Sequence, residues 1–103
     1  MRFWVAVTRN GESESDDRLK RTAPSDRIAF YSPRPKQSFT SIAELTGSSL
    51  NVVSRGEAPV KPLVESLDFI RDKKQWGVYF RRGFFEIGEA DFRKIERAIV
   101  RLP

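Results

Sequence analysis

The segment LDFIRDKKQWGVYFRRGFFEIGEADFRKIERAI, residues 67–99, carries the pattern that decides most of the fold. Aromatic and aliphatic residues gather at residues 76–81 and again at 84–87, with a period of two that predicts two strands. Gly83 stands between them and predicts a turn or bulge, because glycine adopts a left-handed backbone at little cost. Gly88 is an acceptable N-cap, and the apolar residues that follow it recur at the spacing of a last helix.

The chain before this segment predicts four strands and one more helix. The strands fall at residues 3–8, 26–32, 38–46 and 50–54. The last of these ends in a turn at Arg55 and Gly56, whereas residues 9–24 are polar and charged and predict a loop. Proline favours the first turn of a helix, so the helix begins at Pro62. Its buried stripe comprises Leu63, Val64, Leu67 and Ile70.

The predicted order is therefore strand, loop, three strands, helix, two strands and helix. Short strands at close spacing with two helices are typical of an α+β fold, in which helices cover a small, strongly curved sheet or barrel. A chain of 103 residues has room for one hydrophobic core. We therefore expect a single domain over residues 1–103.

The composition excludes several kinds of chemistry, because the chain contains no cysteine and no histidine. A thiol nucleophile, a Ser-His-Asp triad and a zinc site with nitrogen or sulfur ligands are all impossible. Carboxylates alone can bind Mg²⁺ or Ca²⁺, and the acidic cluster is Glu12, Glu14, Asp16 and Asp17. This cluster lacks the spacing of a calcium loop, and charge runs are usually solvated. We expect no metal site, no cofactor and no catalytic residue.

The charge balance indicates a class of partner. The formal net charge is +5, which favours polyanions and raises the rate of encounter with them. No apolar run approaches the about 20 residues that cross a bilayer, and the apolar start is too short for a signal peptide. We therefore expect a cytoplasmic protein with a nucleic-acid partner and no membrane association.

Several motifs together resemble the EVE domain family, a branch of the PUA-like folds related to YTH domains. They are the opening MRFWVAV at residues 1–7, PSDRIAFY at 24–31, SFTSIAE at 38–44 and the run from Pro62 to Phe92. KKQWGVYFRRGFFEI, followed by an acidic helix start, is the most specific of them. The chain is short for the family, and Ser25 stands where a glycine is usual.

The resemblance implies a pseudo-barrel with an aromatic-lined pocket that accepts a flipped-out, often modified, base. The base implied is a methylated or hydroxymethylated cytosine in DNA, or a modified nucleotide in RNA. A base that stacks in a slot lined with aromatic rings regains the few kcal/mol of stacking energy that it loses on flipping out. Reading a modification in this way needs shape and stacking and no catalytic side chain.

The candidate site residues divide into two groups. The pocket residues are Trp4, Tyr31, Ser32, Trp76 and Arg81. The residues near phosphates are Lys61, Lys73, Lys74 and Arg82. Aromatic rings can stack on a base, and arginine can grip a phosphate or base edge with two hydrogen bonds. Each ring can instead belong to the core. Successive strand residues point to opposite faces, so at most one of the two arginines faces the pocket.

We expect a non-catalytic domain that recognises a modified or flipped-out base in nucleic acid. Two alternatives stay open at this point. The stretches at residues 9–22 and 52–60 are short for the family, which favours an accessory or structural protein with a vestigial pocket. A small carboxylate or metal-dependent enzyme needs at least two convergent acids, and the predicted strands offer Glu44 and Glu86.

Overall fold

The computed structural model describes residues 1–8, 22–46 and 49–100, and the acidic cluster at 12–17 lies outside them. Five strands form one sheet in the order β4-β3-β2-β1-β5. They are β1 (Phe3–Val7), β2 (Arg27–Ser32), β3 (Ser38–Thr46), β4 (Ser49–Pro59) and β5 (Phe84–Ile87). β1 and β2 are parallel, and the other three pairings are antiparallel. The prediction of an α+β fold is confirmed, and its small sheet is mixed.

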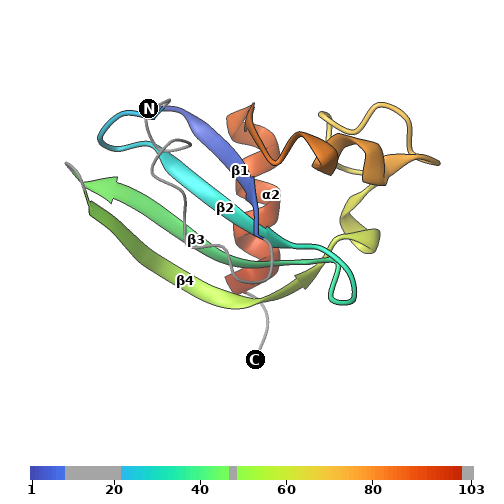
Figure 1. The fold of residues 1–103 in the computed structure, drawn as a ribbon, viewed down its shortest axis with the longest axis horizontal. Coiled ribbons are helices and arrows are strands. Elements are labelled where there is room, and N and C mark those ends of the chain that lie inside the picture. Colours follow the sequence, from blue (N-terminus) through green and yellow to red (C-terminus); the bar gives the residue numbers. More distant parts are fainter. Residues whose placement is uncertain (9–21, 47–48, 101–103) are drawn as a thin grey trace.

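The helix α2 (Glu89–Val100) runs across one face of the sheet (Figure 1). Its stripe of Phe92, Ile95 and Ile99 is fully buried, as the sequence predicts. The Gly88 carbonyl accepts a hydrogen bond from the Phe92 amide at 3.1 Å, as the carbonyl of an N-cap residue does. Phe3 meets Phe92 with ring centroids 4.8 Å apart, which joins β1 to the helix.

The alternation of β1 divides the buried residues between the two faces of the sheet. Phe3, Val5 and Val7 belong to the cluster that packs against α2. Trp4 and Ala6 belong to a second buried cluster with residues of β2, β3 and β5. Alternate residues of a strand point to opposite faces, which accounts for this division.

The predicted turn at Arg55 and Gly56 is wrong, because β4 continues through it to Pro59. Gly56 serves a different purpose there. A Cβ atom at this position would lie 2.9 Å from the Ile99 carbonyl oxygen, at the C-terminal end of α2. Glycine therefore allows the helix to approach the edge strand closely.

The predicted helix from Pro62 is also wrong, apart from one short turn. Only η1 (Lys61–Leu63), a 3₁₀ helix, forms, and the chain then proceeds through turns. In an α-helix the Asp68 amide would donate to the Val64 carbonyl. Here that amide donates to the Asp91 carboxylate at 2.8 Å, and the Val64 carbonyl accepts from the Lys73 ammonium at 3.0 Å. Side chains thus form the hydrogen bonds that these two backbone groups would form with each other in an α-helix.

The predicted strand at 76–81 is wrong as well, and η2 (Trp76–Arg82), a longer 3₁₀ helix, stands in its place. Its backbone is satisfied locally, since the Val78 amide donates to Gln75 and the Gly83 amide donates to Phe80. β1 already pairs with β2 and β5 on its two sides, so it has no free edge for another strand. Gly83 ends η2 with φ of 78°, the left-handed conformation predicted for it.

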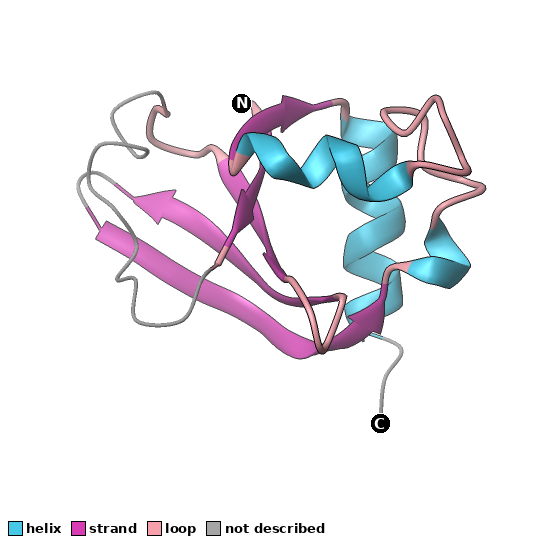
Figure 2. Cartoon of the chain, turned by 45° about the vertical axis from the view of Figure 1, so that its right-hand side comes forward, coloured by secondary structure: helices cyan, strands magenta, loops and turns pink. Residues whose placement is uncertain are grey.

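η1 and η2 lie on the same side of the sheet as α2 (Figure 2). Val64, Leu67, Ile70 and Phe80 are buried in the cluster that contains the α2 stripe. The segment therefore buries the apolar residues that the sequence assigned to a helix, although its backbone is different. Among the described residues, no helix combines the length and apolar character needed to cross a membrane.

Candidate functional site

An open hollow of about 710 Å³ lies where the ends of β1 and β2 meet the loop after β2 and the helix η2. This volume falls within the about 300–1,000 Å³ that is usual for small-molecule sites. Its lining residues are Val7, Tyr31, Pro33, Arg34, Gln37, Lys74, Gln75, Trp76, Gly77, Val78, Phe80 and Arg81. The hollow is thus built from three separate stretches of the chain.

Aromatic rings form the wall of the hollow. Tyr31 and Phe80 stack nearly parallel, with ring centroids 4.1 Å apart and an angle of 16° between their planes. Trp76 meets Phe80 edge-on at 6.2 Å and is half-buried, so part of its indole stays accessible. Stacked and edge-on ring pairs each add stability beyond the area they bury. The wall is therefore rigid and apolar.

Burial raises the pKa of Tyr31 to about 12. The phenol therefore keeps its proton at neutral pH and can donate a hydrogen bond. Tyr31 is only 3% exposed, and its carbonyl accepts from the amide and hydroxyl of Thr8. The residue is fixed by its backbone and by its ring.

The charged lining residues are all cations. Arg34, Lys74 and Arg81 are exposed, and no aspartate or glutamate lies among the lining residues that the structure describes. A rim with one sign of charge attracts anions, and apolar walls strengthen the local field. The arrangement suits a flat ring inside with an anionic group at the rim.

The structure brings together four of the nine candidate residues, namely Tyr31, Trp76, Arg81 and Lys74. Ser32 follows Tyr31 at the end of β2 and is not among the lining residues. Trp4 lies on the other face of the sheet, where it stacks on Phe84 at 4.8 Å. Its indole nitrogen donates to the Asp26 carboxylate at 3.0 Å. Trp4 is thus a core residue in this fold.

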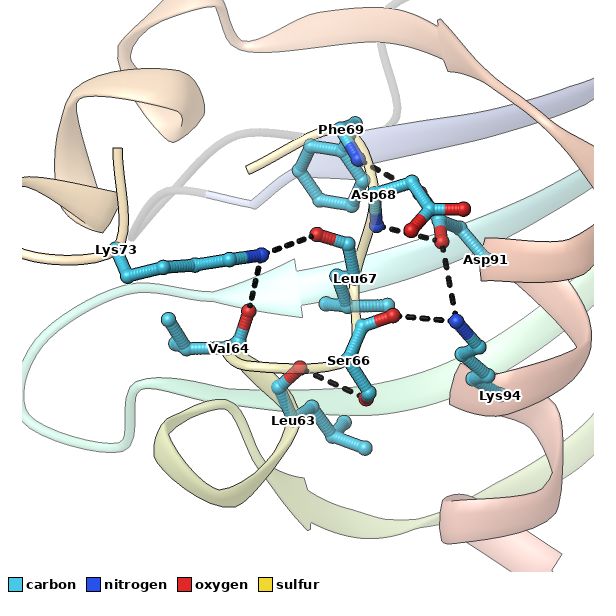
Figure 3. A network of polar contacts seen from close by, with 9 residues as sticks. All are labelled: Leu63, Val64, Ser66, Leu67, Asp68, Phe69, Lys73, Asp91 and Lys94. Carbon is cyan, nitrogen blue, oxygen red and sulfur yellow. Dashed lines mark hydrogen bonds and ion pairs between the residues drawn. The ribbon is translucent and has the colours of Figure 1, made fainter. Parts of the chain in front are cut away.

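The remaining three cations differ in their surroundings. Lys73 donates to the carbonyls of Val64 and Leu67, at 3.0 and 2.9 Å, so its ammonium is engaged within the fold (Figure 3). Arg82 lies over the Phe85 ring at 5.5 Å, and Lys61 is exposed in η1. None of them lines the hollow. Successive residues of a 3₁₀ helix point about 120° apart, which separates Arg81 from Arg82.

A polar network fastens the segment before the hollow to α2 (Figure 3). The two carboxylate oxygens of Asp91 accept the amides of Asp68 and Phe69, each at 2.8 Å. Lys94 donates to the Ser66 carbonyl and lies 3.9 Å from Asp91. Asp91 is buried, and hydrogen bonds to an ionised acceptor are the strong ones. The network holds the turns that lead into η2.

Sequence reasoning missed several lining residues. Phe80 belongs both to the core and to the lining of the hollow. Arg34 and Gln37 come from the loop after β2, which lies between two predicted strands. Gln75 and Val78 border Trp76 in sequence, and that proximity was a usable signal. The structure offers no group of acidic side chains within the described ranges that could hold a metal ion.

No family model matches the chain. Among curated proteins, it is 33% identical over 107 residues to the UPF0310 protein in the gntR 5′ region of Bacillus licheniformis, covering 82% of this chain and 73% of that protein. It is 36% identical over 104 residues to a UPF0310 protein of Mycolicibacterium gilvum, covering 79% of this chain and 74% of that protein.

Solved structures with a similar fold come from other bacteria. Rpa0253 of Rhodopseudomonas palustris, solved by NMR, matches with a TM-score of 0.63 at 8% identity and covers 100% of this chain and 96% of its own. Atu2648 of Agrobacterium tumefaciens, a crystal structure, also scores 0.63 at 10% identity, with 94% and 92% covered. Identity this low shows the fold alone. The curated relatives, by contrast, align over most of their own length, and the chain therefore belongs to the UPF0310 family.

Proposed function

We propose that this chain is a non-catalytic nucleic-acid binding domain whose hollow accepts a flipped-out base, and that its fold is of the PUA-like, EVE type. One observation carries the proposal: an open hollow with aromatic walls has three cations and no acid among its described lining residues. A base fits the rings, and the phosphates beside it fit the cations. The resemblance of residues 62–92 to EVE domains points in the same direction.

The energies are of the required size. Stacking a base on an aromatic side chain is worth about 1–3 kcal/mol, which offsets the few kcal/mol lost when the base leaves its own stack. Trp76 offers the accessible ring, while Tyr31 and Phe80 stack on one another behind it. A methyl group on the base adds about 0.8 kcal/mol if it reaches an apolar wall. A methylated base, such as the modified cytosine or modified RNA base that the resemblance implies, therefore gains affinity over the unmodified one.

The cations Arg34, Lys74 and Arg81 bind the phosphates on either side of the base. Neutralising three phosphates of a single strand gives a slope of about −2 for the logarithm of affinity against the logarithm of salt concentration. Binding by the net charge of +5 alone also depends on salt, but it does not depend on the base. Base preference at high salt therefore separates the two kinds of binding.

The test is a titration of the protein with short single- and double-stranded oligonucleotides at two salt concentrations. The strands carry cytosine, methylated cytosine or hydroxymethylated cytosine at one position. We expect a preference for one modified base that persists at the higher salt. Weak binding that ignores the base and disappears with salt contradicts the proposal and favours an accessory protein with a vestigial pocket.

Two arginine variants assign the binding to the hollow. Arg81→Ala removes a lining cation, whereas Arg97→Ala removes an exposed cation of α2 that does not line the hollow. Both variants lower the net charge by one. We expect Arg81→Ala to weaken binding about tenfold or more and Arg97→Ala to have a much smaller effect. Equal effects would mean that binding reports charge alone.

A further inference from the structure

Two uncharged polar side chains of the hollow come from β2 and from the loop that follows it. They are the Tyr31 hydroxyl and the Gln37 amide, and both residues line the hollow. Tyr31 is 3% exposed, yet no hydrogen bond of its hydroxyl is found among the described residues. Among the described residues the fully buried side-chain atom without a partner is the Arg27 Nε, so the Tyr31 hydroxyl keeps some exposure and is free to bind a ligand in the hollow.

The ring of Tyr31 is packed against two other aromatic rings. Phe80 covers one face of its ring at 4.1 Å, and Phe39 contacts it edge-on at 5.2 Å. Neither neighbour offers a hydrogen-bonding atom in its side chain. Because Tyr31 lines the hollow, a ligand bound there can supply a partner for the hydroxyl.

Gln37 is held at the hollow by its backbone. Its amide donates to the Pro33 carbonyl at 3.4 Å, and its carbonyl accepts from the Val60 amide at 2.9 Å. Its φ of 46° lies in the left-handed region, which few residues other than glycine adopt. Strained backbone of this kind persists where the surrounding structure enforces it and is common at binding sites. Both backbone groups are used, which leaves the side-chain amide available.

We propose that the Tyr31 hydroxyl and the Gln37 amide determine specificity, by hydrogen bonding to the polar edge of a heterocyclic base stacked at Trp76. This inference rests on the proposed function and adds which rings the hollow accepts. A site built to form hydrogen bonds rejects a ring that lacks them, because its own polar groups then remain unpaired. The hollow thus selects a base with donors and acceptors on its edge over an apolar ring of the same shape.

The hydroxyl and the amide have complementary roles in this scheme. The Tyr31 phenol stays protonated at neutral pH, since burial raises its pKa to about 12, and so it can donate. The Gln37 amide can donate through nitrogen and accept through oxygen. Together they match the mixed edge of cytosine or a similar base.

The experiment uses three short duplexes that differ at one central residue opposite an abasic site, from which a base leaves the stack easily. The central residue is methylated cytosine, the apolar ring difluorotoluene, or a second abasic site. The proteins compared are the unmodified chain, Tyr31→Phe, Gln37→Met and the control Tyr79→Phe. Tyr79 does not line the hollow, and its hydroxyl accepts from the Asp72 amide at 2.9 Å.

We expect the unmodified chain to bind the methylated cytosine duplex about tenfold more tightly than the difluorotoluene duplex. Tyr31→Phe and Gln37→Met should each reduce this ratio severalfold, and Tyr79→Phe should preserve it. Tyr31→Phe keeps the ring that stacks on Phe80, and Gln37→Met tests the same idea from another element.

Three results would overturn the inference, and they separate a wrong specificity assignment from a failure of the proposed function. If the unmodified chain prefers either ring over the abasic site but does not distinguish the rings, the proposed function holds and the specificity assignment is wrong. The same conclusion follows if both variants keep the full ratio. If all three duplexes bind equally, the hollow accepts no base and the proposed function fails with it.

Discussion

The sheet and the segment that forms the hollow are each fastened by a buried aspartate, but they are built in different ways. In the sheet, Asp26 accepts the Arg2 amide at 2.8 Å and the Trp4 indole at 3.0 Å, next to strands that already pair along their length. At the segment of residues 61–83, Asp91 accepts two amides that no strand or helix would otherwise satisfy.

The difference shows what each kind of structure requires. Strands need only alternating apolar residues and a neighbour, whereas the segment of residues 61–83 needs particular polar side chains from elsewhere in the chain. Its apolar residues pack onto the sheet, and Asp91 and Lys73 then satisfy the backbone that this packing leaves without partners. The hollow therefore depends on contacts that are distant in sequence.

The largest expected effect comes from Phe80→Ala, which removes the ring at the centre of the segment. Its ring neighbours are Tyr31, Phe39, Phe69, Trp76 and Phe85. Removing a buried phenylalanine ring costs about 3–5 kcal/mol of unfolding free energy. Urea unfolding measures the loss, and Phe80→Leu is the control that keeps most of the volume. A loss below about 1 kcal/mol would contradict the packing described for η2.

Asp91→Asn should have the next largest effect. An asparagine has one acceptor oxygen, so its NH₂ group faces one of the two amides that Asp91 now accepts. We expect a loss of about 2–3 kcal/mol and faster hydrogen exchange at the Asp68 and Phe69 amides. Glu89→Gln, in the same helical turn but exposed, is the matched control. Unchanged exchange at those two amides would show that the network does not hold the segment.

Asp26→Asn should cost less and should depend on pH. Burial by itself raises the pKa of Asp26, but hydrogen bonds from Ala23, Arg2 and Trp4 outweigh it and hold the pKa below its ordinary value of 3.8. A lowered pKa stabilises the fold above the unfolded value and stops doing so as the pH falls through the folded value. We expect a loss of about 1–2 kcal/mol at neutral pH. The difference from the unmodified chain should shrink below pH 3.8 in acid unfolding curves, and a constant difference would contradict this account.

The smallest expected effect separates two neighbouring lysines. Lys73→Met keeps the aliphatic stem but loses the hydrogen bonds to the Val64 and Leu67 carbonyls, which costs about 1 kcal/mol. Lys74→Met should leave stability close to that of the unmodified chain and weaken oligonucleotide binding, because Lys74 lines the hollow. Unfolding and binding measured on both variants test the contrast. Identical behaviour of the two would contradict the different roles assigned to them.

The same contrast explains how far the sequence could be interpreted. The alternation of Phe3 and Trp4 and the stripe of Phe92 and Ile95 correctly predicted β1 and α2, because each pattern matches one repeating geometry. The structure of residues 61–83 was not predicted correctly. Their apolar spacing suits a helix or a strand, but it also suits turns when distant side chains form the hydrogen bonds of the backbone.

The site was accessible to sequence reasoning only in part. Tyr31, Trp76 and Arg81 were named from their ring and charge chemistry, and the structure brings them to one hollow. Gln37 carries no such signal, since its position depends on a left-handed turn and on a hydrogen bond from Val60. Trp4 and Trp76 both offered an aromatic ring for stacking. The alternation of side chains along β1 sends Trp4 to the face of the sheet away from the hollow, and this alone distinguishes the two.

Those two tryptophans provide the most direct test of the central claim, that a base stacks in the hollow. Trp4 is buried on the far face of the sheet, and Trp76 lines the hollow, so nitrogen-labelled protein contains one reporter and one internal control. On titration with an oligonucleotide that carries methylated cytosine, we predict that the indole N–H resonance of Trp76 shifts saturably while that of Trp4 stays in place. If binding occurs and the Trp76 resonance does not move, or moves no more than that of Trp4, the base does not enter the hollow and the account is wrong.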